Sequence, residues 1–298
     1  MKIAAAYLAL LFCFSSTCCA QSQTAPAATN PSTKPRSTTT DDSMVLIPGG
    51  TFQMGIDPAD IPRFQKIFAI ENARLFQDEL PRHTVIVKDF YIDKNLVTNA
   101  QFKAFVDANP DWSPDTIRKD FDNGNYLQHW ASPASRNARP THPVVNVNWF
   151  AAASYCIWAG KRLPTEAEWE FAAGGGQNRV FPWGDELPDE TRANFNDDVG
   201  TTTPVGAYPP NPYGLHDMAG NAWQFLADGW APYSAAELQG PPLLVLSQPG
   251  ILRRVIRGGS YAGHAVNLWI EYRDSHPSNG SQPFVGFRCA QPAPSRLS

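Results

Sequence analysis

Turn-forming residues interrupt the sequence so often after Gly174 that no long helix or strand fits there. This half of the chain consists of short segments separated by turns, among them FPWGDE, ANFNDD, RVIRGGSY and VGFRCA. The 298 residues include 27 prolines, 21 glycines and nine tryptophans, a composition typical of long connections held in place by aromatic packing. We therefore expect a single α+β domain with little regular secondary structure, built from short elements around one core.

The first 20 residues have the pattern of a secretory signal peptide. Lys2 precedes an apolar run from Ile3 to Phe14, and small residues lead to an expected cleavage site after Ala20. The run is too short for a typical membrane span, and no later segment has about 18 uninterrupted apolar residues. We expect a periplasmic or secreted protein without a membrane span. A lipid anchor is an alternative because cysteines lie near the cleavage site, although none follows a Leu-small-small pattern.

Residues 21–43 are rich in Thr, Ser, Pro and Ala and have few large apolar side chains. Such a segment cannot bury enough surface to fold, so it is predicted to be a disordered linker before a folded domain at 44–294. The net charge of −4 and the absence of a basic block argue against nucleic acid as a partner. We expect a monomer.

Local patterns predict one strand and three helices in the first half of the domain. Residues His83–Val97 alternate between apolar and polar, as in a half-buried strand, and Thr98 then caps a short helix, NAQFKAFVDA. A second helix is expected over about Trp149 to Ala159. In PTEAEWEFAA, Thr165 and Glu168 form a capping box that fixes the start of a third helix.

Removal of the signal peptide leaves two cysteines, Cys156 and Cys289. Two cysteines in an oxidising compartment are typical of a disulfide. Two buried free thiols are the alternative that the residues alone leave open.

An ordered series of motifs from about Met44 to Ala290 resembles the formylglycine-generating enzyme, or sulfatase-modifying factor, family. These motifs are IPGGTFQMG, DELPRHTVIVKDFYIDKNLVTNAQFKAFV, HPVVNVNWFAAASYCIWAGKRLPTEAEWEFAAGGG, FPWGDE, TPVGAYPPNPYGLHDMAGNAWQF, RGGSY and VGFRCA. The resemblance implies the family fold, a variant of the C-type-lectin architecture, together with bound calcium and an extracytoplasmic location. It also implies a bridge between Cys156 and Cys289, which match a pair that is bridged in vertebrate members.

The resemblance further implies two structural calcium sites, each made of loop oxygens, which calcium prefers. The first site would consist of Asn194, the carbonyl of Phe195, Asp197 or Asp198, and the carbonyl of Val199. The second would consist of Asp217, the carbonyls of Gly220 and Ala222, and the side chain of Gln224. The family usually has Glu where this chain has Gln224, so the second site carries less negative charge. From the residues alone, NFNDD would be interpreted as a solvated acidic turn.

The family's copper(I) ligands are absent from this chain. Two cysteines that hold the copper fall on Gly263 and Leu268, and neither side chain can bind a metal. The family's standard copper chemistry is therefore not available.

The residues that remain in RGGSYAGHAVNLWIEYR are candidates for a different chemistry: Ser260, Tyr261, His264 and Glu271. A histidine is suited to moving protons near neutral pH. The alternative is structural, with His264 bonded to a loop carbonyl, Ser260 capping a turn, and Glu271 paired with Arg273 on one face of an alternating strand. No nucleophile elbow surrounds Ser260, which argues against a Ser/His hydrolase.

Two functional hypotheses follow. The first is an exported oxidoreductase-like protein that matures a peptide. One branch of the family, exported and without copper cysteines, is required to mature the chromophore of the siderophore pyoverdine, and this chain is similar to it in size, export signal and site composition. The second is a non-catalytic, calcium-stabilised binding or regulatory module. A third hypothesis, an iron centre as in ergothioneine-forming relatives, lacks the helical metal domain that those relatives carry.

Overall fold

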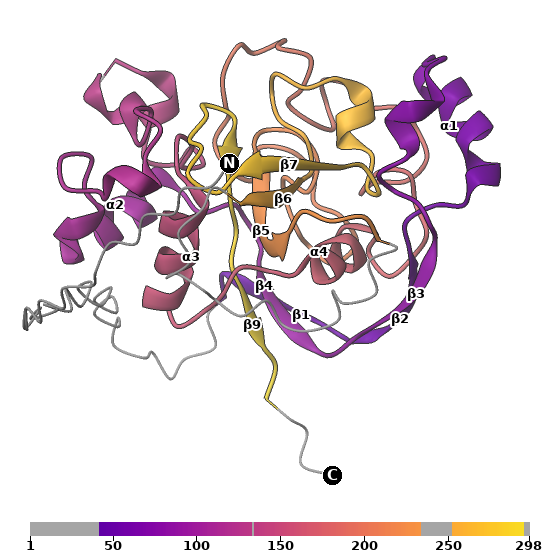
Figure 1. Ribbon diagram of the computed structural model, residues 1–298, viewed down its shortest axis with the longest axis horizontal. Coiled ribbons are helices and arrows are strands. Elements are labelled where there is room, and N and C mark those ends of the chain that lie inside the picture. The colour runs from indigo at the N-terminus through magenta and orange to yellow at the C-terminus, as the bar shows by residue number, and fades with distance from the viewer. Residues whose placement is uncertain (1–41, 133, 234–251, 295–298) are drawn as a thin grey trace, which may run out of the picture.

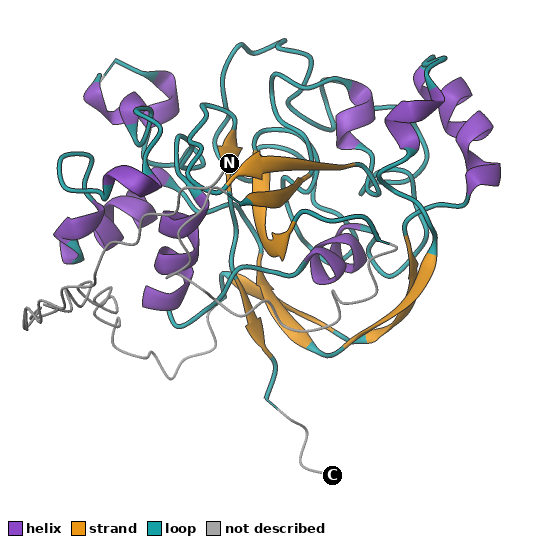
Figure 2. Cartoon of the chain, in the orientation of Figure 1, coloured by secondary structure: helices purple, strands orange, loops and turns teal. Residues whose placement is uncertain are grey.

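The computed structural model describes residues 42–132, 134–233 and 252–294. The predicted signal peptide and nearly all of the predicted linker lie outside the described residues. The described part has four short α-helices, several 3-10 turns and three small sheets joined by long loops (Figures 1 and 2). The predicted α+β class with little regular structure is confirmed.

Two small antiparallel sheets contain the N-terminal strands. In the first, β4 (Phe90–Asp93) lies between β1 (Met44–Ile47) and β9 (Ala290–Pro292), so the two ends of the domain share one sheet. In the second, β2 (Gly50–Met54) pairs with β3 (His83–Val87). Figure 1 shows these strands as one curved layer below the rest of the molecule.

The single strand predicted over His83–Val97 is wrong, because the chain forms β3 and β4 in different sheets. The break falls at Lys88 and Asp89, where Asp89 Oδ1 accepts the backbone N–H of Gly49 at 2.7 Å. A Cβ on Gly49 would lie 2.5 Å from the Val87 carbonyl oxygen. The chain therefore bends close to Gly49 at this point. Burial alternates along β3, whereas β4 is buried at Phe90, Ile92 and Asp93.

The third sheet has four strands and forms the centre of the fold. Its order is β7 (Arg273–Pro277), β6 (Arg253–Arg257), β5 (Trp223–Gly229) and β8 (Val285–Gly286). The β5–β8 pair is parallel and the other two pairs are antiparallel.

The three predicted helices are confirmed by their caps. Helix α2 (Asn99–Ala108) begins after Thr98, α3 (Trp149–Trp158) after Asn148, and α4 (Glu166–Ala173) after Thr165, and each capping side chain accepts a backbone N–H of the first turn. Helix α1 (Ile61–Phe68) was not predicted. The 3-10 turns lie at Pro58–Asp60, Ala73–Phe76, Pro110–Trp112, Lys119–Phe121, Gln128–Ala131, Arg136–Ala138 and Ala265–Leu268.

The core divides into three main groups of buried side chains. Helices α2 and α3 pack against β5 and β8 through Phe102, Tyr155, Phe225 and Phe287. Helix α4 packs Trp169 against strands β4 and β6. Helix α1 packs Phe64 against Trp269, with ring centroids 4.2 Å apart. Aromatic contacts therefore hold the loops in place, as the composition predicts.

The predicted disulfide is confirmed. Cys156 in α3 is bonded to Cys289, directly before β9, with the two Cα atoms 5.6 Å apart. The bridge lies in the core group of α2, α3 and β5, where both cysteines are fully buried. Across the described ranges, the helices are all too short or too polar to span a bilayer.

Candidate functional site

Two glycines at the end of β6 set the path of the loop that was predicted to hold the site. Gly258 and Gly259 have φ angles of 92° and 69°, a region that side chains rarely adopt. A Cβ on Gly259 would lie 2.8 Å from Leu268 Cδ1, and one on Gly258 would lie 3.1 Å from the ring of Trp169. The two glycines of the RGGSY motif are therefore needed for close packing of this loop, whether or not the loop takes part in a reaction.

The two positions at which the resemblance places the family's copper cysteines are part of the packed structure. Leu268 is 1% exposed and belongs to the core group around Trp269. Gly263 lies in a tight turn, where its N–H donates to the Ser260 carbonyl at 3.0 Å and its own carbonyl accepts from Asn196 at 2.7 Å. A buried leucine and a turn glycine therefore lie at these two positions.

Three of the predicted catalytic residues lie on this turn. Ser260 and Tyr261 are buried, and the Tyr261 backbone bonds to Asn221 and to Asp197 at 3.1 and 2.7 Å. His264 is exposed, and its backbone N–H donates to Asn267 Oδ1 at 2.8 Å at the start of the 3-10 turn. These contacts give the turn a structural role and leave the His264 ring at the surface.

The fourth predicted residue, Glu271, lines a separate cavity of about 360 Å³ between β2, α4 and the loop after α4. Neither Ser260, Tyr261 nor His264 lines it, so the structure does not bring the four predicted catalytic residues together in one site. The lining residues are Thr51, Phe52, Gln53, Glu170, Phe171, Gly174, Gly176, Gln177, Asn178, Arg179, Ile270 and Glu271.

Glu271 has an unusual electrostatic environment. Burial and, to a lesser degree, the negative charge of Glu170 raise the pKa of Glu271 to about 8. Its Oε2 atom is buried and has no hydrogen-bond partner within the described ranges. A carboxyl with a pKa near neutrality, at the wall of a cavity, is a candidate for proton transfer.

The predicted pairing of Glu271 with Arg273 on one strand is wrong. Strand β7 starts only at Arg273, and the preceding segment forms a 3-10 turn at Ala265–Leu268. Instead, the Nε and Nη2 atoms of Arg273 donate to the two carboxylate oxygens of Glu166, each at 2.9 Å. Trp269 and Ile270 are consecutive and both buried, so this segment does not have the alternating burial of a half-buried strand.

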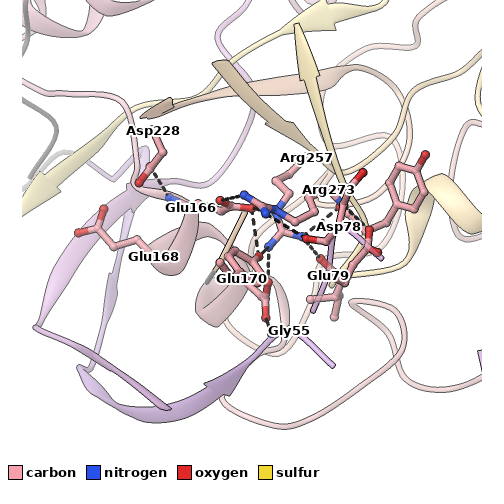
Figure 3. A network of polar contacts seen from close by, with 12 residues as sticks. Gly55, Asp78, Glu79, Glu166, Glu168, Glu170, Asp228, Arg257 and Arg273 are labelled. Atoms are coloured by element: carbon pink, nitrogen blue, oxygen red, sulfur yellow. Dashed lines mark hydrogen bonds and ion pairs between the residues drawn. The ribbon is translucent and has the colours of Figure 1, made fainter. Parts of the chain in front are cut away.

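Beside the cavity lies a buried network of acidic and basic side chains (Figure 3). Arg257 contacts Glu170 through Nη2 and Glu166 through Nε, the latter at 3.1 Å. Glu170 also accepts the backbone N–H of Gly55 at 3.1 Å. These contacts join α4, β6, β7 and the segment after β2, and they fix Glu170 in the cavity wall.

Two further carboxyls in the network have pKa values near neutrality. Burial raises the pKa of Glu79 to about 7, although Glu79 Oε1 accepts the N–H of Arg273 at 3.2 Å. Burial, and then the charge of Glu166, raise the pKa of Asp228 to about 7. Sequence reasoning missed this network. The only signal was the spacing of Glu166 and Glu170 four residues apart, which places both carboxylates on one face of α4.

The first predicted calcium loop has one buried oxygen without a partner in the described part of the chain. Asn194 Nδ2 donates to the Thr201 carbonyl at 2.9 Å, and its Oδ1 atom is buried without a partner in the part of the chain that the structure describes. Asp197 and Asp198 follow on an exposed turn. The Phe195 carbonyl accepts the Asp198 N–H at 3.2 Å, and the Val199 carbonyl accepts Arg136 Nη2 at 3.3 Å. Side-chain oxygens of this kind suit calcium, so the first site stays a prediction.

The residues of the second predicted calcium site do not fit a cation in this arrangement. The Gln224 amide oxygen already accepts from Trp169 Nε1 at 2.9 Å and from Arg288 Nε at 2.7 Å. The Asp217 carboxylate accepts from the Gly206 N–H at 2.8 Å and from Asn221 Nδ2 at 3.2 Å. The guanidinium of Arg288 therefore already supplies a positive charge where the calcium ion was predicted, next to the loop that holds Gly220 and Ala222.

The fold and the site together define a disulfide-linked α+β domain of the sulfatase-modifying class. A family profile described as the sulfatase-modifying factor enzyme 1-like domain matches residues 28–293. The chain belongs to this family.

Relatives and solved structures agree with that assignment. The formylglycine-generating enzyme of Streptomyces coelicolor is 35% identical over 321 residues, which cover 92% of this chain and 96% of the relative. The enzyme of Bos taurus is 32% identical over 292 residues, covering 83% and 74%. The structure of PvdO from Pseudomonas aeruginosa matches with a TM-score of 0.62 at 24% identity, over 84% of this chain and 94% of that chain. The last likeness shows the fold.

Proposed function

We propose that this chain is an exported, copper-free member of the family that takes part in the oxidative maturation of a peptide-derived substrate. The substrate class that we propose is a siderophore precursor of the pyoverdine type. Family membership, the N-terminal signal pattern and the loss of both copper ligands support this proposal. A calcium ion on the Asn194 loop belongs to the proposal as a structural component.

The observation that carries the proposal is the position of Glu271. A carboxyl of raised pKa lines a cavity of about 360 Å³, large enough for one side chain of a peptide. Because its pKa lies within about one unit of neutrality, Glu271 can both accept and return a proton. Glu170, held by Arg257 and Gly55, keeps the cavity wall in place.

The reaction that fits this group is the removal of two hydrogens from a carbon–nitrogen single bond. The Glu271 carboxylate takes the proton from carbon as the double bond forms. The electron pair passes to dioxygen, which takes up the proton from nitrogen and the proton returned by Glu271 and becomes hydrogen peroxide. Glu271 ends in its starting form, and the substrate is lighter by two hydrogens.

A deletion strain of the host tests this function. Mass spectrometry of its secreted peptides should show a precursor two hydrogens heavier than the wild-type product, and the wild-type gene should restore the product. Glu271→Gln should slow conversion at least about a hundredfold, since loss of a general base costs that much. Glu190→Gln, which removes a charge at an exposed position outside the cavity, is the matched control.

Two outcomes would contradict the proposal. If the deletion strain secretes the mature product, the chain does not take part in this maturation. If Glu271→Gln converts the precursor as fast as Glu190→Gln does, Glu271 is not the proton acceptor. His264→Ala should convert normally, because the His264 ring is exposed and lies outside the cavity.

A non-catalytic binding module is the second candidate. It is favoured by the buried Leu268 and by the hydrogen-bonded turn at Gly263, because both positions take part in packing and neither offers a reactive side chain. In that case the cavity would bind a ligand without changing it. Recovery of the unchanged ligand after incubation with the purified protein and dioxygen would support this candidate.

A further inference from the structure

We infer that the Glu271 cavity is a binding site for the ammonium end of a ligand with an apolar stem. The inference rests on the proposed function in that it names the substrate class of the same cavity. It concerns binding alone, so it can be tested without any turnover.

One wall of the cavity is apolar. The rings of Phe52 on β2 and Phe171 on α4 lie with centroids 5.3 Å apart, and Ile270 lines the cavity with them. Such a wall favours a hydrocarbon or aromatic group, because burial of apolar surface is favourable. A volume of about 360 Å³ accommodates a stem the size of an aromatic side chain.

The opposite part of the wall holds two carboxyls with different surroundings. Glu170 is satisfied by the guanidinium of Arg257 and by the Gly55 N–H. Arg257 is in turn shared with Glu166. Glu271 is therefore the lining carboxyl whose charge the network does not balance, and one of its oxygens is buried without a hydrogen-bond partner within the described ranges.

The other groups that face Glu271 do not supply the missing positive charge. β2 contributes uncharged lining residues. Arg179, in the loop after α4, also lines the cavity, but it donates from Nη2 to the neutral Gln177 Oε1 at 2.9 Å and no ion pair joins it to Glu271 within the described residues. Arg257 lowers the pKa of Glu271 less than burial and Glu170 raise it. An entering ammonium group would replace the proton on Glu271, and rotation about the terminal torsion can turn either oxygen toward the ligand.

The two carboxyls also determine which charge on the ligand is favoured. An anion would meet Glu170 and the Glu271 carboxyl in a desolvated site, which is unfavourable. A neutral hydroxyl can hydrogen-bond to the Glu271 carboxyl but cannot balance its charge once it is ionised. A cation on an apolar stem pairs with the ionised carboxyl and also gains the apolar contacts.

Three probes that share a phenylethyl stem and differ in the charge of the end group test the inference on the wild-type protein: phenethylammonium, 2-phenylethanol and 3-phenylpropionate. Calorimetric titration at pH 7 should show phenethylammonium binding at least about tenfold more tightly than the alcohol, with the propionate weakest. Equal affinities for the ammonium and the alcohol, or tighter binding of the propionate, would overturn the inference.

Proton release provides a second, independent measurement. Because Glu271 has a pKa of about 8, it is about 90% protonated at pH 7, and binding of a cation should release about 0.9 proton per ligand. Titration in two buffers of different ionisation enthalpy measures this number, which should fall toward zero at pH 9. Binding without proton release at pH 7 would contradict the ion pair with Glu271.

Glu271→Gln should abolish both the preference for the ammonium and the proton release, whereas Glu190→Gln should retain both. The thermal melt of each variant shows whether it folds, and the probe series on the wild type decides the question if Glu271→Gln does not fold. The binding test and the test of the proposed function can fail independently of each other. Charge-selective binding in a protein whose deletion leaves the secreted peptide unchanged would retain the site and reject the maturation role.

Discussion

Arg257 on β6 and Glu170 on α4 form an ion pair from which solvent is excluded, although 87 residues separate them in the chain. The Arg257 side chain has no exposed surface, and its Nη1 atom also donates to the carbonyls of Ile270 and Tyr272 at 3.0 Å. One guanidinium thus connects the helix, the central sheet and the segment that carries Glu271.

Replacement of Arg257 should be strongly destabilising. Arg257→Met leaves the buried Glu170 carboxylate without its cation, and breaking such a pair costs about 3–5 kcal/mol. Urea unfolding of the purified protein measures the loss. Arg118→Met is the matched control, because Arg118 and Asp120 pair at the surface with both side chains more than half exposed, and should cost less than about 1 kcal/mol. Equal losses for the two variants would contradict the buried role of Arg257.

Stability should fall as the pH rises from 6.5 to 8. Glu79, Asp228 and Glu271 have folded-state pKa values of about 7, 7 and 8, above their ordinary values, so the folded state binds more protons than the unfolded chain in this range. Their contribution is full at low pH and is lost as the pH passes through the folded-state values. Burial lowers the pKa values of His129 and His276 to about 4, so these histidines change the stability with pH only below pH 6.5.

The variant Glu79→Gln isolates one of these contributions. Between pH 6.5 and pH 8, the variant should lose about 1 kcal/mol less unfolding free energy than the wild type. The reason is that Glu79 is fully buried and gives up its proton in that window. Chemical unfolding at four pH values gives the slope. A slope unchanged from the wild type would show that Glu79 is already ionised in the folded protein.

Loss of the disulfide should cost about 4–5 kcal/mol. The bridge between Cys156 and Cys289 closes a loop with a sequence separation of 133, and the loss of loop entropy in the unfolded chain grows with that length. The double variant Cys156→Ala, Cys289→Ala avoids a stray thiol and should melt well below the wild type. Two reactive thiols on alkylation of the unreduced, denatured wild-type protein would instead rule out the bridge.

A chelator should lower the melting temperature, since an ion bound only to the folded state stabilises it by about 2.7 kcal/mol at one hundred times its dissociation constant. The double variant Asp197→Asn, Asp198→Asn should lose this response, because both carboxylates lie on the first predicted calcium loop. Gln224→Leu is a control for the second loop and should keep the response. An unchanged wild-type melt in chelator would reject calcium on the first loop.

Much of the fold could be predicted because its signals are local. Thr98 and Thr165 mark helix starts through bonds made within four residues, and the structure places α2 and α4 directly after them. The partner of Cys156 followed from the family resemblance together with the count of remaining cysteines. Helix α1 was missed because its apolar side chains, such as Phe64, contact Trp269 far along the chain.

The candidate site was less predictable because burial and pairing are tertiary properties. The sequence identified Glu271 but not the cavity wall formed by Phe52 and Phe171, which come from different segments. It also placed His264 in the site on the basis of its chemistry, whereas the loop geometry leaves the ring exposed. The expected pairing of Glu271 with Arg273 failed because a strand pattern alone does not show which helix covers the strand.

The pairing of β9 with β4, and of β8 with β5, has a consequence for how the chain folds during synthesis. The first sheet lacks one edge strand, and the central sheet lacks its parallel edge strand, until residues 285–292 have left the ribosome. These long-range pairings raise the contact order, which slows folding. Both sheets therefore stay incomplete in the growing chain until its last strands emerge.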